Sequence, residues 1–371
     1  MTTKTFVLFP SLGVGHLNPM VELAKHLRRR GLGVIVAVID PPNNDAMSAD
    51  AMARLAAANP SVTFRILPAP ASPDPGAHHV KRNLDTLRLA NPVLREFLRS
   101  LPAVDALLLD MFCVDALDVA AELAIPAYFF FPSPASVLAV FSHLPYYYRN
   151  APSLREMDKA ALIRFPGIPP IRNVDMLATV KDKESETAKI RLYQFKRMME
   201  GKGVLVNSFD WLEPKALKAL AAGVCVPNEP KQRVYFIGPL VDARKKHEAV
   251  GAFVPHCGWN STLEAIMSAL PMICWPLYAE QAMNKVIMVE EMKIAVSLDG
   301  YEEGGLVKAE EVEAKVRLVM EAEEGRKLRE RLVETRDMAL DAIKEAGSSE
   351  VAFDEFMRDL EKSSLENGVR S

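Results

Sequence analysis

Cysteine, tryptophan and long apolar runs are scarce in this sequence, and each scarcity excludes a class of protein. The 371 residues include only 4 cysteines and 3 tryptophans. No two cysteines form a C-x-x-C pair, so we expect reduced thiols and neither a disulfide scaffold nor a zinc site. The longest apolar run, residues 125–141, is interrupted by prolines and serines. We therefore expect no integral membrane segment.

An excess of positive charge is also missing. The chain has 45 Lys and Arg against 48 Asp and Glu, a formal net charge of −3. Because no basic surplus exists to neutralise a phosphate backbone, we do not expect nucleic acid as a partner. The share of apolar residues, 49%, is typical of a globular protein, and the length predicts two or three domains. The first residues show no signal peptide, so we expect a cytoplasmic protein.

Strand and helix signals alternate along residues 1–240, which we predict to be one domain. The strand signals are unbroken apolar runs, which are typical of strands buried on both faces of a sheet. The predicted strands are 6–9, 34–39, 62–67, 106–109, 127–131, 203–207 and 234–237. Helical patterns lie between several of them, including one helix over 83–101. This order predicts an α/β fold with a doubly wound parallel sheet, a Rossmann-like domain.

A second, smaller α/β unit is predicted to follow a linker at 241–248. It spans 249–345, with strands at 249–254, 271–275 and 294–298 and helices at 260–269 and 279–292. Three strands are few for a doubly wound domain, so this unit is expected to be truncated. The last segment, 346–371, is predicted as a helix that packs back on the first domain, since one face carries Phe353, Phe356, Met357 and Leu360.

Two polar residues follow predicted strands of the first domain. His16 lies in the glycine-rich turn after strand 6–9, and Asp110 ends strand 106–109. Ligands of open α/β sheets bind at this carboxyl edge, where the two side chains can meet. A His–Asp pair can act as a general base on a substrate hydroxyl. Either residue could instead cap a helix, and spacing alone leaves both interpretations open.

Residues 249–264 and 275–281 carry the clearest binding signal. His256 ends a strand, Gly258 makes a turn, and Asn260 and Ser261 open a helix, which is an arrangement that binds phosphate. Glu264 lies one turn further on and can accept hydrogen bonds from a ribose. Tyr278, Glu280 and Gln281 again follow a strand and should face the same crevice. A thiol nucleophile at Cys257 is disfavoured, since neighbours in sequence such as His256 and Cys257 rarely align for proton transfer. A serine hydrolase is also disfavoured, because no G-x-S-x-G motif is present.

Two of these segments resemble the signature of a known family. The runs HCGWNSTLE (256–264) and WPLYAEQ (275–281) resemble the signature box of plant family 1 UDP-glycosyltransferases, which have the GT-B fold of two Rossmann-like domains. Residues 15–20, 109–113 and 206–213 agree with it. The chain looks most like the group that glucosylates flavonoids, chalcones and anthocyanidins in plant secondary metabolism.

The resemblance implies a role for each residue. His16 would be the general base and Asp110 its partner. The diphosphate of a UDP-sugar would be held by His256, the Trp259 backbone, Asn260 and Ser261. Glu264 would bind the ribose, while Glu280 and Gln281 would bind glucose. The reaction would be an inverting transfer from UDP-glucose to an aromatic acceptor, without metal or cofactor, in a protein that acts as a monomer.

The sequence departs from the family in two places. About 100 residues, the size of a small domain, are missing between the linker and strand 249–254. They include the tryptophan that stacks on uracil, and such stacking is worth roughly 1–3 kcal/mol. Pro255 also stands where the family usually has threonine or serine. The alternative function is therefore an impaired or inactive relative that retains only acceptor binding. A GT-B phosphorylase is disfavoured, since no pyridoxal-phosphate lysine site is recognisable.

Overall fold

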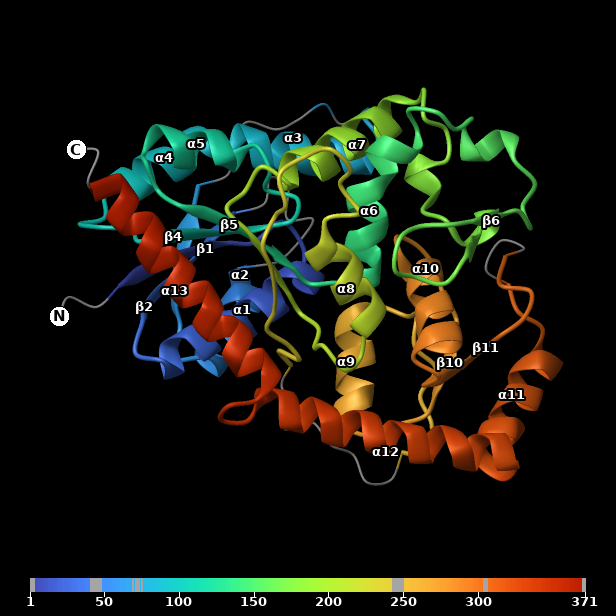
Figure 1. Ribbon diagram of the computed structural model, residues 1–371. Coiled ribbons are helices and arrows are strands. Elements are labelled where there is room, and N and C mark those ends of the chain that lie inside the picture. Colours follow the sequence, from blue (N-terminus) through green and yellow to red (C-terminus); the bar gives the residue numbers. More distant parts are fainter. Residues whose placement is uncertain are drawn as a thin grey trace.

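The computed structural model describes residues 4–40, 49–68, 70, 74, 76–241, 250–302 and 306–368. The linker predicted at 241–248 lies outside the described residues except for Val241. Figure 1 shows a larger part built around a sheet, a smaller part coloured orange, and a C-terminal segment that returns to the first part.

A parallel sheet of seven strands forms the larger part, which confirms the α/β prediction. Its strand order is β3-β2-β1-β4-β5-β8-β9, and every neighbouring pair is parallel. The strands are β1 (Thr5–Phe9), β2 (Gly33–Ile39), β3 (Thr63–Leu67), β4 (Ala106–Asp110), β5 (Ala127–Phe131), β8 (Val204–Val206) and β9 (Val234–Phe236). Because β1 pairs with both β2 and β4, the chain segments after β1 and β4 leave the sheet side by side.

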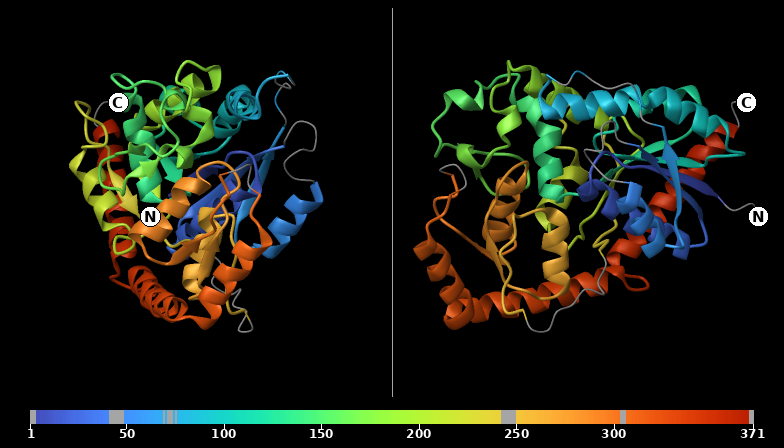
Figure 2. Two further views of the ribbon diagram at one scale, coloured as in Figure 1. Left: turned by 90° about the vertical axis from the view of Figure 1, so that its right-hand side faces the viewer. Right: turned by 180° about the vertical axis from the view of Figure 1, so that it is seen from behind.

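Helices connect and cover these strands (Figure 2). They are α1 (Val14–Arg29), α2 (Ala49–Ala58), α3 (His79–Leu89), α4 (Asn91–Arg99), α5 (Ala116–Glu122), α6 (Ala135–Tyr147), α7 (Glu186–Met198) and α8 (Pro214–Ala222). The single helix predicted over 83–101 was wrong. It divides at Ala90, because Pro92 in the first turn of α4 has no N–H and favours a helix start.

The smaller part contains β10 (Met272–Cys274) and β11 (Ala295–Ser297), which pair in parallel. Its helices are α9 (Trp259–Met267), α10 (Gln281–Val286), which continues as the π-helical turn η5 (Ile287–Glu291), α11 (Ala309–Glu321) and α12 (Glu323–Ile343). A short antiparallel pair, β6 (Leu162–Ile163) and β7 (Ile171–Arg172), and the 3₁₀ turns η2 (Leu154–Glu156), η3 (Asn173–Asp175) and η4 (Ala178–Val180) lie in the larger part.

The strand predicted at 249–254 does not form in the described residues 250–254. Only one parallel bridge, Phe253 with Met272, joins this segment to β10. The next ladder bond would need an N–H at position 255 to reach the Ile273 carbonyl, and Pro255 has none. The Pro255 carbonyl still accepts a bond of 3.0 Å from the Trp275 N–H, so the pairing continues on one side only.

The C-terminal helix α13 (Ser348–Gly368) packs across the face of the large sheet, beside β9 (Figure 1). The predicted apolar stripe on this helix is confirmed. Phe353, Phe356 and Leu360 are fully buried, and the Phe356 ring lies 4.9 Å from Tyr128 and 5.6 Å from Tyr235. The end of the chain therefore completes the core of the first part.

Truncation of Phe356 tests this packing. Phe356→Ala should cost about 3–5 kcal/mol of unfolding free energy, because it opens a cavity between α13 and the sheet. Urea unfolding followed by circular dichroism measures the cost. Val351→Ala on the same helix, where the side chain is 43% exposed, should change it by under about 0.5 kcal/mol. Equal small costs for both variants would show that α13 does not complete the core.

Candidate active site

The His–Asp pair predicted from sequence is formed in the structure. The His16 Nδ1 donates a hydrogen bond of 2.8 Å to the Asp110 Oδ2. Asp110 is fully buried, and its other carboxylate oxygen accepts a bond of 3.1 Å from the Phe112 N–H. Neither residue caps a helix, since α1 is capped by Gly13 and α5 by Asp115. The capping interpretation is therefore wrong for both residues.

The hydrogen bond to Asp110 fixes the chemistry of the His16 ring. An ionised carboxylate only accepts hydrogen bonds, so Nδ1 carries the proton and Nε2 is left as a base. Burial by itself lowers the pKa of His16, but the Asp110 carboxylate outweighs it, with a smaller contribution from Glu280, and the pKa is raised above 6.5. The side chain is 26% exposed, so a substrate can reach it.

A second ring and a cation lie beside the pair, and sequence reasoning missed the cation. The Phe112 ring meets the His16 ring edge-on, with centroids 4.9 Å apart. The Arg191 guanidinium from α7 lies 4.8 Å from the centroid of the Phe112 ring. No sequence signal marked Arg191, because a lone arginine in a helix is typical of a solvated surface. It lies instead beside the base.

The first turn of α9 joins the smaller part to the edge of the large sheet. The Asn260 side-chain N–H donates a bond of 2.9 Å to the Gly15 carbonyl, in the turn that holds His16. The Trp259 indole N–H donates a bond of 2.6 Å to the Asn207 carbonyl, just beyond β8. The first of these bonds brings the N-terminus of α9 next to His16.

The turn before α9 has little room. Gly258 is the N-cap of the helix, and a Cβ at position 258 would collide with the His256 ring. Only glycine therefore leaves that ring in place. Ser261 is half-buried and Glu264 is exposed on the first turns of the helix. The Asn260 Oδ1 is buried without a hydrogen-bond partner.

The segment before α10 reaches the same region from the other side. The Glu280 carboxylate accepts a bond of 3.1 Å from the Ser133 hydroxyl, in the turn after β5. The Gln281 Oε1 accepts bonds of 2.9 Å from the Leu277 and Tyr278 N–H groups. This leaves the Gln281 Nε2 to a substrate. The Tyr278 ring is 70% exposed and stacks on the His256 ring at 6.5 Å.

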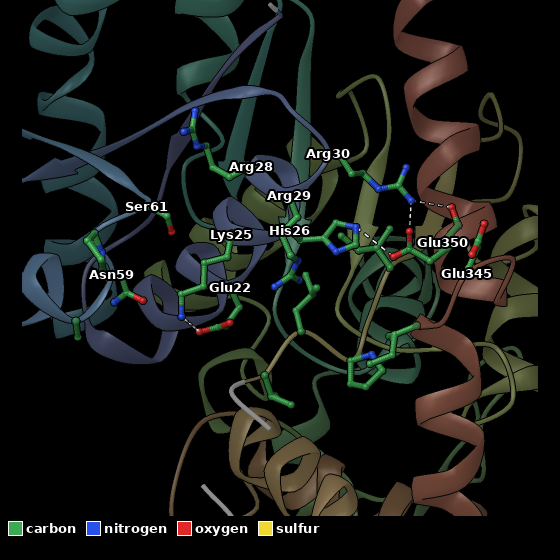
Figure 3. Close-up of a pocket in the computed structure, with 17 residues that line it drawn as sticks. Glu22, Lys25, His26, Arg28, Arg29, Arg30, Asn59, Ser61, Glu345 and Glu350 are labelled. Carbon is green, nitrogen blue, oxygen red and sulfur yellow. Dashed lines mark hydrogen bonds and ion pairs between the residues drawn. The ribbon is translucent and has the colours of Figure 1, made fainter. Parts of the chain in front are cut away.

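A cavity of about 1050 Å³ lies away from these residues, between α1, the start of α13 and residues 237–241 (Figure 3). Its lining does not include the His–Asp pair. Several of its charged groups are paired with each other: Lys25 with Glu22 at 2.6 Å, and Arg30 with Glu350. This cavity is therefore separate from the candidate active site, which lies around the His–Asp pair at the sheet edge.

The described part of the chain has neither clustered metal-ligand side chains nor exposed thiols. It contains no group of three or more His, Cys, Asp or Glu side chains placed to hold a metal ion. The four cysteines are free and buried. Burial raises the pKa of Cys113, which keeps that thiol protonated. No helix within the described ranges has the length and apolarity needed to cross a membrane.

Comparisons with known proteins identify the family. Residues 208–324 match the family model described as UDP-glucoronosyl and UDP-glucosyl transferase. A UDP-glycosyltransferase from Stevia rebaudiana is 31% identical, in an alignment that spans 95% of this chain and 98% of the relative. The chain belongs to the UDP-glycosyltransferase family. A glycosyltransferase of Rosa, an anthocyanidin 5,3-O-glucosyltransferase, is 29% identical over 94% of this chain and 97% of its own.

Solved structures agree with the GT-B fold. A UDP-glucosyltransferase from Polygonum tinctorium superposes with a TM-score of 0.86 and 26% identity, covering 97% of this chain and 99% of its own. A glycosyltransferase of Phytolacca americana, in complex with UDP-2-fluoroglucose and pterostilbene, gives a TM-score of 0.85 and 26% identity, covering 97% and 100%. The predicted fold class of this glycosyltransferase is confirmed.

The alignments also bear on the expected deletion. The Stevia alignment runs over 457 residues, more than the 371 of this glycosyltransferase. The relative therefore has residues without a counterpart here, as the sequence predicted. The place of the gap at 241–248 and the domain boundaries stay predictions.

The His16 titration tests the geometry of the pair. In the native protein the pKa of His16, followed by NMR of the imidazole ring, should lie above 6.5. Asp110→Asn should bring it below 6.5, because burial remains while the raising charge is gone. The control Asp118→Asn removes an exposed carboxylate, 72% accessible, and should leave the pKa of His16 unchanged. An unchanged pKa in Asp110→Asn would contradict the contact.

Proposed function

We propose that this glycosyltransferase moves glucose from UDP-glucose to a hydroxyl of a phenolic acceptor, with His16 as the general base. The observation that carries the proposal is the Asn260–Gly15 hydrogen bond, which brings the start of α9 beside the His–Asp pair. A base and a helix N-terminus that favours phosphate then face one space. The Rosa relative acts on anthocyanidins, and relatives from Malus domestica and Pyrus communis are phloretin 2'-O-glucosyltransferases.

The proposed reaction is a single displacement. The acceptor oxygen forms a bond to the anomeric carbon of glucose while the bond from that carbon to the phosphate oxygen breaks. The His16 Nε2 takes the proton of the acceptor hydroxyl, and Asp110 stabilises the imidazolium that results. The electron pair of the broken bond stays on the phosphate oxygen of UDP. Because attack comes from the face opposite the leaving group, the anomeric configuration inverts.

The leaving diphosphate is the group that most needs stabilisation, since it gains negative charge. We place it at the start of α9, where the His256 ring, the Ser261 hydroxyl and the first N–H groups of the helix, including those of Trp259 and Asn260, supply donors and a favourable dipole. This scheme needs no metal, because the hydrogen-bond donors and the helix dipole stabilise the negative charge of the diphosphate.

Glu264 and the Glu280–Gln281 pair complete the proposed donor site. Glu264 is exposed one turn into α9, so its carboxylate is free to accept hydrogen bonds from the ribose hydroxyls. Glu280 and the Gln281 Nε2 would bind glucose hydroxyls between α10 and the base. Monomeric state and a cytoplasmic location stay predictions.

A second candidate function is favoured by the tryptophans. Uracil needs a flat partner, and the three tryptophans of the chain have other contacts. Trp259 is buried and bonded to Asn207, Trp211 lies under the Arg331 guanidinium at 4.4 Å, and Trp275 is half-buried behind β10. With the stacking residue lost, the chain would bind phenolic acceptors without transferring sugar.

A transfer assay separates the two candidates. With UDP-glucose and a panel of flavonoids and chalcones, the native chain should form β-glucosides, identified by the anomeric proton coupling in NMR. His16→Gln should lower the rate by roughly 10²–10⁴, because the base is lost while the shape of the site is kept. An unchanged midpoint of thermal unfolding serves as the control for folding.

Two results would contradict the proposal. Full activity of His16→Gln would show that His16 is not the base. Formation of α-glucosides would show that the reaction does not invert the anomeric carbon. No transfer by a folded native chain that still binds phenols would support the second candidate.

A further inference from the structure

Arg191 is a cation placed beside the His–Asp pair. It stacks on Phe112, and Phe112 packs against the His16 ring. Its Nη1 donates a bond of 2.9 Å to the Gln194 Oε1. The Gln194 Nε2 in turn donates a bond of 3.0 Å to the Met111 carbonyl, one residue past Asp110. The guanidinium is therefore held in a fixed position relative to the base.

The charge of Arg191 has no counterion in the described part of the chain. No carboxylate there lies within 4.0 Å of the guanidinium, and its Nε is buried without a hydrogen-bond partner. Glu280 acts on it only through space, and the Glu280 carboxylate is already bonded to Ser133. Burial lowers the pKa of Arg191 to about 10, so it remains charged at neutral pH. A partly desolvated cation of this kind is costly unless an anion joins it.

Another arginine of α7 is paired with carboxylates, in contrast to Arg191. Arg197, two turns further along α7, forms ion pairs with both Asp118 and Glu200. Arg191 faces inward instead, toward Phe112 and the space between His16 and Glu280, and its positive charge acts on the pKa of both His16 and His79. An anion that satisfies Arg191 would therefore lie in the same space as the acceptor.

We infer that Arg191 binds an anionic group of the acceptor, so that the site prefers phenols carrying a carboxylate over neutral phenols of the same shape. The inference rests on the proposed function for the identity of that space as the acceptor side. The acceptor hydroxyl would face the His16 Nε2, its ring would pack on Phe112, and its carboxylate would reach the outer edge of the Arg191 guanidinium. An arginine suits this task, because its planar N–H groups match a carboxylate.

Binding of two matched phenols tests the inference without any sugar donor. The probes are 4-hydroxycinnamate and its methyl ester, which share ring and hydroxyl and differ in charge. Calorimetric titration of the native chain should give at least tenfold tighter binding of the acid. Arg191→Met should remove most of that preference while keeping the affinity for the ester. Arg191→Lys should restore part of it, since the charge returns without the fork of donors.

Lys189→Met is the matched control. It removes one positive charge from the same helix at a side chain that is 61% exposed, so the preference for the acid should be unchanged. A loss of preference in this variant would mean that net charge alone, rather than Arg191, attracts the acid.

The outcomes distinguish this inference from the proposed function. Equal affinity of the native chain for acid and ester overturns it. Equal weakening of both probes in Arg191→Met also overturns it, because Arg191 would then only support the Phe112 ring. A preference for the acid that depends on Arg191, in a chain that transfers no glucose, would keep the inference and reject the proposed function.

Discussion

The first turn of α9 holds the two parts of the molecule in the relation that the site needs. Its Asn260 amide binds the Gly15 carbonyl, and its Trp259 indole binds the Asn207 carbonyl. Both acceptors lie at the carboxyl edge of the large sheet, where β1 and β8 end. Neither bond requires the residues that this chain lacks relative to its longer relatives, so the start of α9 still lies against the edge of the large sheet.

Two further contacts keep this arrangement closed. Near η3, the buried Asp175 carboxylate accepts a bond of 3.1 Å from Lys285 on α10 and bonds to the Tyr301 hydroxyl, so larger and smaller parts share a desolvated charge. Such a pair is costly to break from one side. At the opposite end, α13 buries Phe353 and Phe356 against the sheet. The second part and the C-terminal helix that follows it are therefore each anchored on the first part.

Much of the fold was predictable because buried parallel strands appear as apolar runs bounded by turns. The His16–Asp110 contact followed from that order, since β1 and β4 are neighbours. The sequence did not reveal α6, which is apolar on nearly every face, or α7, and so gave no hint of Arg191. The strand predicted at 249–254 failed because its apolar composition favours a strand while Pro255 and the lack of a second neighbour oppose one.

Calorimetric titration of the folded chain with UDP measures whether the donor site persists without the residues that the longer relatives have. We expect millimolar or tighter binding that is lost in Glu264→Ala, since the start of α9 and the exposed Glu264 carboxylate are in place. Absence of UDP binding by a chain whose unfolding transition is cooperative would contradict this expectation, and would show that the missing residues, including the uracil-stacking tryptophan of the family, are indispensable.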